Sequence, residues 1–111
     1  MSVLTEKKLG ANSVNTSETT IYTVPASTTA IVKIIWITNV TAADIAIDVW
    51  NPAVATTGVA NKLCSSLTVP ANDFVQINTY LPMPTTSTII AKMITGAASA
   101  ATVLVYGAEI S

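Results

Sequence analysis

The chain is built from short segments rich in Val, Ile and Thr, and turn-forming residues separate these segments at short intervals. β-Branched residues favour extended strands, while the helix formers Glu, Lys, Gln and Leu are scarce. No stretch repeats its apolar residues at helical spacing. The segments that we expect to form strands are 20–24, 30–39, 44–50, 61–69, 73–78, 88–94 and 102–110.

Turn signals lie between these segments, and strands of this length and spacing are typical of all-β sandwiches. The turns are expected at residues 25–27, 40–43, 51–52, 70–73, 82–84 and 96–99. With 111 residues the chain has room for one domain. We therefore predict an antiparallel β-sandwich or jelly-roll-like fold of about seven to eight short strands over residues 19–111.

Residues 1–18 are polar and show no periodicity, so they are predicted to form an extended N-terminal arm. Such an arm would be able to lie across a neighbouring subunit. A frayed terminus is the alternative.

Segment 30–39 is apolar on both of its predicted faces. Strict alternation would place Val32, Ile34 and Trp36 on one face, and Ile31, Ile35 and Ile37 on the other, with only Lys33 interrupting the second row. A strand with two apolar faces is normally covered on both, whereas a two-layer sandwich covers one. The second face is therefore expected to meet another subunit, or, as the alternative, a long loop such as 52–60.

The composition points in the same direction. Charged residues make up 10% of the chain and hydrophobic residues 50%, against roughly 25% charged residues in an average soluble domain. A domain of this size leaves about a third of its unfolded-chain surface exposed, so some of that surface must be apolar. We expect an obligate oligomer or a subunit of a larger assembly.

Several kinds of chemistry lack the residues they need. The chain has no His, and Cys64 is its single Cys, so catalytic triads with His, His-based metal sites and intrachain disulfides are excluded. Five Lys and no Arg give no basic surface for nucleic acid. We predict no enzyme, no cofactor and no metal site. The carboxylates of Glu18, Asp44, Asp48, Asp73 and Glu109 are expected to be surface groups, and Cys64 a small buried hydrophobe.

A carbohydrate-binding platform built from Trp36, Trp50, Phe74 and Tyr80 is an alternative use of the aromatic residues.

The residues at 1–10 include Lys7 and Lys8 but no apolar run after them, so no signal peptide is predicted. The apolar run 30–38 is too short to span a bilayer, and no membrane association is expected.

Three motifs resemble the small virion structural proteins of tailed bacteriophages. They are TIYTVPASTTAIVKIIWITN at 20–39, LTVPAND at 67–73 and VLVYGAEIS at 103–111. The resemblance covers 8–111 in the same order, and its motifs are turns and edge strands. The chain departs from the family at Ser27, where Gly is usual, and at Thr28, where Lys is common. These departures concern the geometry of the first turn.

The resemblance implies a structural component of the virion. The expected role is a capsid decoration, or cement, protein on the capsid surface, assembled in the host cytoplasm. Its expected partners are further copies of itself in a homotrimer and the major capsid protein, with no nucleic acid and no membrane. The alternative is a tail or tail-fibre module that binds a host receptor or glycan. Residues expected at the subunit or capsid interface are Lys7, Lys8, Lys33, Trp36, Trp50, Tyr80 and Met83.

Overall fold

The computed structural model of the chain describes residues 4–52, 58 and 61–111. These residues contain eight strands and no α-helix. The strands are β1 (Leu4–Val14), β2 (Thr19–Thr23), β3 (Thr29–Asn39), β4 (Ile45–Trp50), β5 (Lys62–Val69), β6 (Phe74–Met83), β7 (Thr88–Thr95) and β8 (Ala101–Ile110).

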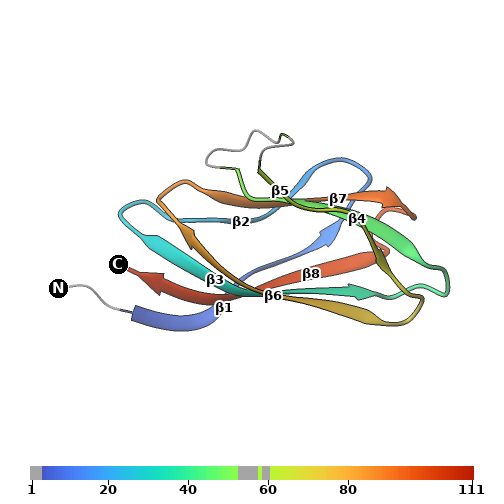
Figure 1. The fold of residues 1–111 in the computed structure, drawn as a ribbon, viewed down its shortest axis with the longest axis horizontal. Coiled ribbons are helices and arrows are strands. Elements are labelled where there is room, and N and C mark those ends of the chain that lie inside the picture. The colour runs from blue at the N-terminus through green and yellow to red at the C-terminus, as the bar shows by residue number, and fades with distance from the viewer. Residues whose placement is uncertain (1–3, 53–57, 59–60) are drawn as a thin grey trace.

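The strands form two four-stranded sheets that pack face to face (Figure 1). Sheet A has the order β1-β8-β3-β6, sheet B has the order β2-β7-β4-β5, and all neighbours are antiparallel. Apart from the β4–β5 hairpin, each strand is followed along the chain by a strand of the opposite sheet. This order is that of a jelly roll with two Greek keys, and it confirms the predicted fold class.

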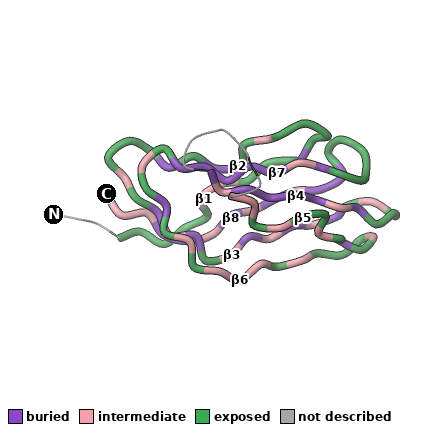
Figure 2. Tube along the Cα trace, turned by 45° about the horizontal axis from the view of Figure 1, so that its top comes forward, coloured by how far each residue is buried: buried purple, intermediate pink, exposed green. Residues whose placement is uncertain are grey.

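The core lies between the sheets and is made of aliphatic side chains. Buried residues run along β4 and β7 of sheet B, whereas exposed residues gather in the loops (Figure 2). The side chains that fill the core from the four central strands include Val32, Ile35, Ile37, Ile47, Val49, Ile89, Val103 and Val105. Each of these has essentially no exposed surface.

A bulge at Lys33 changes which residues of β3 face the core. Val32 and Ile34 pair with Gly107 and Tyr106, two consecutive residues of β8, so Lys33 is an extra residue on β3. A bulge of this kind shifts the alternation by one residue beyond it. The expected rows were therefore wrong: Val32, Ile35 and Ile37 are buried, whereas Ile31, Ile34 and Trp36 are half-buried on the outer face of sheet A.

Gly107 makes room for this bulge. A Cβ atom at Gly107 would lie against the carbonyl oxygen and carbonyl carbon of Ile31, at a distance too short for any side chain. The bulge and the glycine opposite it therefore depend on each other.

The tight turns share a backbone feature at their third residue. Ser27, Asn72, Thr86 and Ser99 have φ angles of 56°, 54°, 72° and 62°. The Asn72, Thr86 and Ser99 turns are each closed by a backbone hydrogen bond from the fourth residue to the first, at 3.1–3.2 Å. At Ser27 the chain keeps a positive φ without the glycine that favours it.

Asn39, at the end of β3, ties the neighbouring loops together. Its Nδ2 group donates to the carbonyl oxygens of Ala43 (2.7 Å) and Val69 (3.1 Å), and its Oδ1 atom accepts from Thr41 N (3.0 Å). The side chain is 1% exposed, so these bonds satisfy a buried amide. This is the physical role of the Asn that ends the long apolar strand of the first motif.

Two boundaries differ from the sequence prediction. Residues 4–14 are not an arm separate from a 19–111 sandwich, because they form β1, which pairs with β8 along its length. The expected turn at 82–84 begins later, since β6 continues through Pro82 to Met83. β6 is an edge strand, where the missing N–H of proline does not interrupt the sheet.

Candidate interface on the outer face of sheet A

The outer face of sheet A carries a cluster of half-buried apolar side chains on its two central strands. Ile34 and Trp36 of β3 lie opposite Tyr106 and Leu104 of β8. Together these four residues line an open hollow of about 500 Å³. We call Ile34, Trp36, Phe74, Leu104 and Tyr106 the aromatic cluster.

Phe74 on β6 completes the cluster beside Trp36. The two rings are stacked with their centroids 4.4 Å apart and their planes 9° from parallel. Trp36 Nε1 donates to Thr38 Oγ1 (3.1 Å), so the only polar atom of the indole already has a partner within the strand. The cluster therefore presents fixed ring surface, and Phe74 remains 47% exposed.

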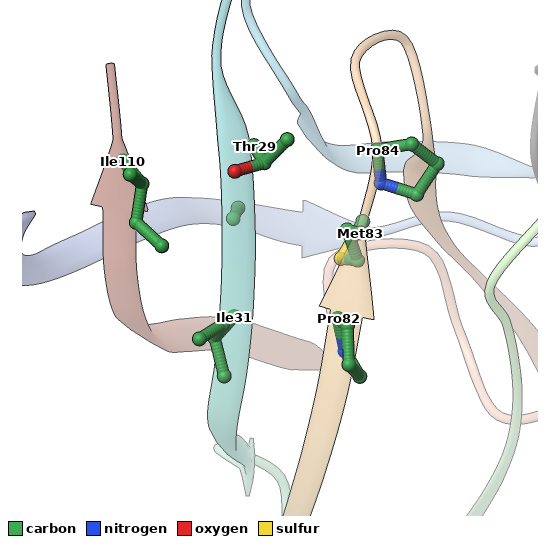
Figure 3. A pocket seen from close by; sticks show the side chains of 7 residues that line it. Thr29, Ile31, Pro82, Met83, Pro84 and Ile110 are labelled. Carbon is green, nitrogen blue, oxygen red and sulfur yellow. The ribbon is translucent and has the colours of Figure 1, made fainter. Parts of the chain in front are cut away.

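A second apolar hollow lies nearer the end of the same sheet. It has a volume of about 380 Å³, and its wall comes from three neighbouring strands: Ile110 of β8, Thr29 and Ile31 of β3, and Pro82 of β6, with Pro84 following (Figure 3). The apolar surface thus extends from the aromatic cluster along the sheet.

Charged residues flank the apolar surface on the β1 side. Glu6, Lys7, Lys8 and Lys33 border a third hollow, of about 360 Å³, which also touches Ile34 and Tyr106. Lys33 Nζ lies 2.6 Å from Glu6 Oε1, and this hydrogen bond and the charge of Lys33 lower the pKa of Glu6. Both side chains are exposed, so the pair orients charge on the surface and adds little stability.

Five of the seven predicted interface residues lie on this outer face or on its border. Trp36 is in the aromatic cluster, Tyr80 is 64% exposed on β6, and Lys8 and Lys33 lie at the charged border. Lys7 also borders the third hollow, but its Nζ atom lies toward the rim between the sheets, 2.7 Å from Glu109 Oε1. The sequence analysis did not predict Leu104 and Tyr106 as surface residues, nor their grouping with Ile34 and Phe74.

The other two predicted residues are nearly buried. Met83 is 1% exposed, belongs to the core and also lines the second hollow (Figure 3), and Trp50 is 7% exposed at the end of β4 in sheet B. Little of either side chain is left for a partner to contact. Segment 102–110 contained a signal for Leu104 and Tyr106. These residues alternate with Val103 and Val105, which are also apolar, so the strand has apolar side chains on both of its faces.

The outer face of sheet B differs from that of sheet A because it holds a buried carboxylate, that of Asp48, in an ion pair with Lys62. Asp48 is 6% exposed, with its Oδ2 atom 2.9 Å from Lys62 Nζ, and its Oδ1 atom accepts from Ser66 N (2.6 Å). Burial opposes the charge of Asp48, but the hydrogen bonds from Lys62 and Ser66 and the charges of Lys62 and Lys92 outweigh it and lower its pKa. The prediction of Asp48 as a surface group was wrong, because its partners on β5 and β7 enclose it.

The alternative expectation, that the loop 52–60 covers β3, falls mostly outside the described residues. Asn51 donates to Thr88 O (2.9 Å), and Pro52 O accepts from Thr88 N (3.1 Å), so this segment leaves along β7 in sheet B. Residues 53–57 and 59–60 lie outside the described residues. The outer side chains of β3 remain half-exposed.

The described residues offer few other groups that could react with a substrate or bind a metal ion. Cys64 is half-buried, and burial raises the pKa of its thiol, as expected for a cysteine that packs rather than reacts. Within the described ranges, no three His, Cys, Asp or Glu side chains come together as metal ligands. The same ranges contain no helix long and apolar enough to cross a membrane.

Comparison of the chain with protein-family models, with curated proteins and with solved structures finds no significant match. The outer face of sheet A is thus the candidate site on geometric grounds alone.

Proposed function

We propose that the chain is a structural protein of a tailed-bacteriophage virion, and specifically a capsid decoration protein. In this role it stabilises the shell by bridging major capsid protein subunits. The proposal combines the resemblance of the three motifs with the jelly-roll fold, an architecture that viral capsid proteins share with lectins and cupins. Fold analogy alone does not assign a function, because one fold serves many functions, and the chemistry of the surface has to support the assignment.

The observation that carries the proposal is the aromatic cluster on the outer face of sheet A. Trp and Tyr are enriched where proteins associate, and rings held by neighbours lose little entropy on binding. Trp36 is held by Phe74 and by its hydrogen bond to Thr38. A side chain that is fixed before association suits a permanent contact between virion proteins.

The mechanism is mechanical. Packaged DNA strains the shell, and each bound copy adds contacts across a joint between capsid subunits. Individually weak contacts gain strength when one subunit makes several of them at once. Neighbouring capsid subunits can then separate only if all of these contacts break together.

The role is tested by counting copies of the chain in purified virions and by measuring attachment to particles that lack it. We expect hundreds of copies per virion. Leu104→Thr, which removes an aliphatic surface from the aromatic cluster, should weaken attachment at least tenfold. Ile94→Thr is the matched control, because Ile94 is 45% exposed at the end of β7 in sheet B. A chain absent from virions, or equal effects of both variants in folded protein, would refute the proposal.

A receptor-binding tail module is the second candidate, favoured by one observation. Gln76 and Asn78 lie on the outer face beside the stacked Trp36 and Phe74 rings, with Gln76 Nε2 3.2 Å from Asn78 Oδ1. Rings next to amides are suited to stacking on, and hydrogen bonding with, a sugar. This candidate predicts tens of copies per virion or fewer, and inhibition of infection by excess free protein.

A further inference from the structure

The edge strand β6 differs from the other three edges of the sandwich. The edges of sheet A are β1 and β6, and those of sheet B are β2 and β5. β6 extends over ten residues, Phe74–Met83, and contains no charged side chain; its protection is limited to Pro82 near its end and to a register shift in its pairing with β3 beside Thr79 and Tyr80. Proteins usually protect long edge strands with charges, bulges or short length, because an edge presents backbone N–H and C=O groups that pair with another strand.

The other edges of the described chain add a charged residue or a shorter length to such irregularities. β1 contains Glu6, Lys7 and Lys8 and is interrupted by a register shift between Lys8 and Gly10. β2 has five residues with a register shift within them. β5 carries Lys62, and its pairing with β4 is interrupted around Ser66, which has a φ of 50°.

The inner side chains of β6 are also incompletely covered. Val75, Ile77 and Leu81 are half-buried, whereas their partners on β3 are completely buried. On the outer side, Phe74 and Tyr80 are 47% and 64% exposed. Both faces of the strand therefore gain burial if another strand joins this edge.

We propose that β6 pairs with β6 of a second copy of this chain, antiparallel about a two-fold axis, so that the two A sheets form one eight-stranded sheet. A two-fold contact brings each residue close to its own copy or near neighbours, so a charged strand would face like charges. β1, with two adjacent Lys, is unsuited to this, and the uncharged β6 is suited. A second copy also supplies the same alternation of inward and outward side chains.

The alternation limits the register. Pairing centred on Ile77 places Phe74 opposite Tyr80, Val75 opposite Thr79 and Gln76 opposite Asn78. Odd-numbered residues then stay on the core side and even-numbered residues on the outer side. Aromatic pairs across neighbouring strands stabilise sheets. The outer faces of both copies become one surface, so the dimer holds two aromatic clusters side by side in the same sheet.

The proposal concerns self-association and does not depend on the virion role. It makes the dimer the basic unit, in place of the trimer expected from the resemblance. The test uses the full chain at concentrations from about 1 μM to about 1 mM, with its mass measured by sedimentation equilibrium and its amide hydrogen exchange followed by mass spectrometry. We expect a dimer whose β6 amides become protected as concentration rises, while the β1 amides do not.

Asn78→Lys places a charge on the edge at an exposed position and should raise the dimer dissociation constant at least tenfold. Asn78→Thr keeps the site neutral, and Ser13→Lys adds the same charge at an exposed position on β1, the opposite edge of sheet A. Both controls should dimerise like the unmodified chain. Unchanged thermal unfolding confirms that all three variants fold.

A chain that is monomeric or trimeric throughout this range overturns the proposal. So does a dimer that gains no protection in β6, or that Ser13→Lys weakens as much as Asn78→Lys does. A monomer that still decorates capsids refutes the dimer alone, and a β6-linked dimer that is absent from virions refutes the virion role alone.

Discussion

Ser27 adopts a backbone conformation that L-residues with a Cβ atom disfavour. Its φ of 56° lies in the left-handed region, which costs roughly 1–2 kcal/mol for residues other than glycine. The chain thus keeps the turn while accepting strain at its third residue.

Ser27→Gly should therefore stabilise the protein. Relief of the strain is partly offset by the larger entropy of glycine in the unfolded chain, which leaves a gain of about 0.5–1 kcal/mol. Urea unfolding followed by circular dichroism measures this difference. Ser27→Ala, which keeps the Cβ atom, should show no such gain, and equal stabilisation by both changes would contradict the argument.

Tyr22 and Glu109 connect the two sheets at the rim of the sandwich. Tyr22 Oη donates to Glu109 Oε2 (2.6 Å), and Lys7 Nζ contacts the other carboxylate oxygen. Hydrogen bonds from Lys7 and then Tyr22 lower the pKa of Glu109. Burial, together with the hydrogen bond and negative charge of Glu109, raises the pKa of Tyr22 far above its usual range.

This network predicts a loss of stability in alkali. Above pH ~10 the unfolded chain releases the Tyr22 proton while the folded chain retains it, so the folded state binds more protons and the free energy of unfolding falls as pH rises. Tyr22→Phe should cost about 1.5–3 kcal/mol at pH 7 because the bond to a charged group is lost. Between about pH 10 and 12, the free energy of unfolding of the Tyr22→Phe variant should fall less than that of the unmodified chain, as measured by urea unfolding. Parallel curves for both proteins would contradict this.

For single residues, the sequence shows which chemical groups are present, but it does not show which side chains contact one another in the fold. The lack of His and the single Cys exclude whole classes of chemistry on composition alone. The buried position of Asp48 could not be predicted, because Lys62 and Ser66 reach it from β5 and the sequence does not give the pairing of β4 with β5.

At the scale of elements, β1 belongs to the body of the fold. It pairs with β8 from Leu4 to Val14, its Val14 is buried, and Leu9 packs against the core. Gly10 lies where a Cβ atom would meet the carbonyl oxygen of Ile21, so β1 and β2 approach closely at this edge.

Deletion of residues 1–12 should consequently destabilise the whole domain rather than remove a tether. The deletion leaves β8 as an unprotected edge and uncovers the core beside Leu9. We expect a lower melting temperature and aggregation, measured by circular dichroism and light scattering. Lys7→Gln with Lys8→Gln keeps the strand and should have a small effect. A truncated chain with an unchanged melting temperature would return residues 4–14 to the role of an arm.

Seven of the eight strands could be predicted because each carries a β-branched, apolar run between turn signals. β1 was missed because most of its side chains are exposed, so polar residues occupy positions that a buried strand fills with apolar ones. The shift of face in β3 was missed for another reason: a bulge depends on the strand opposite, here on Gly107, and leaves no mark in the alternation of β3 itself.

At the scale of the molecule, the fold joins segments that are far apart in the sequence. β8 lies between β1 and β3, and β3 also pairs with β6, so sheet A cannot form until most of the chain is present. Topologies of this kind fold slowly because long loops must close before their contacts form.

We expect refolding in milliseconds to seconds, with the same rate in both sheets. Trp36 reports on sheet A and Trp50 on sheet B, so Trp50→Phe and Trp36→Phe provide separate fluorescence probes. Stopped-flow dilution from urea measures each rate. Microsecond folding, or clearly different rates for the two probes, would contradict a single cooperative transition.

The pairing of the first strand with the last has a practical consequence. Leu4 lies opposite Ile110, so both ends of the described chain emerge at one end of the sandwich (Figure 1). A short peptide linker would join them, and a circularly permuted version opened at a surface turn would keep every strand neighbour. A protein fused to either terminus would likewise lie at this same end of the sandwich, away from the turn at Asn72.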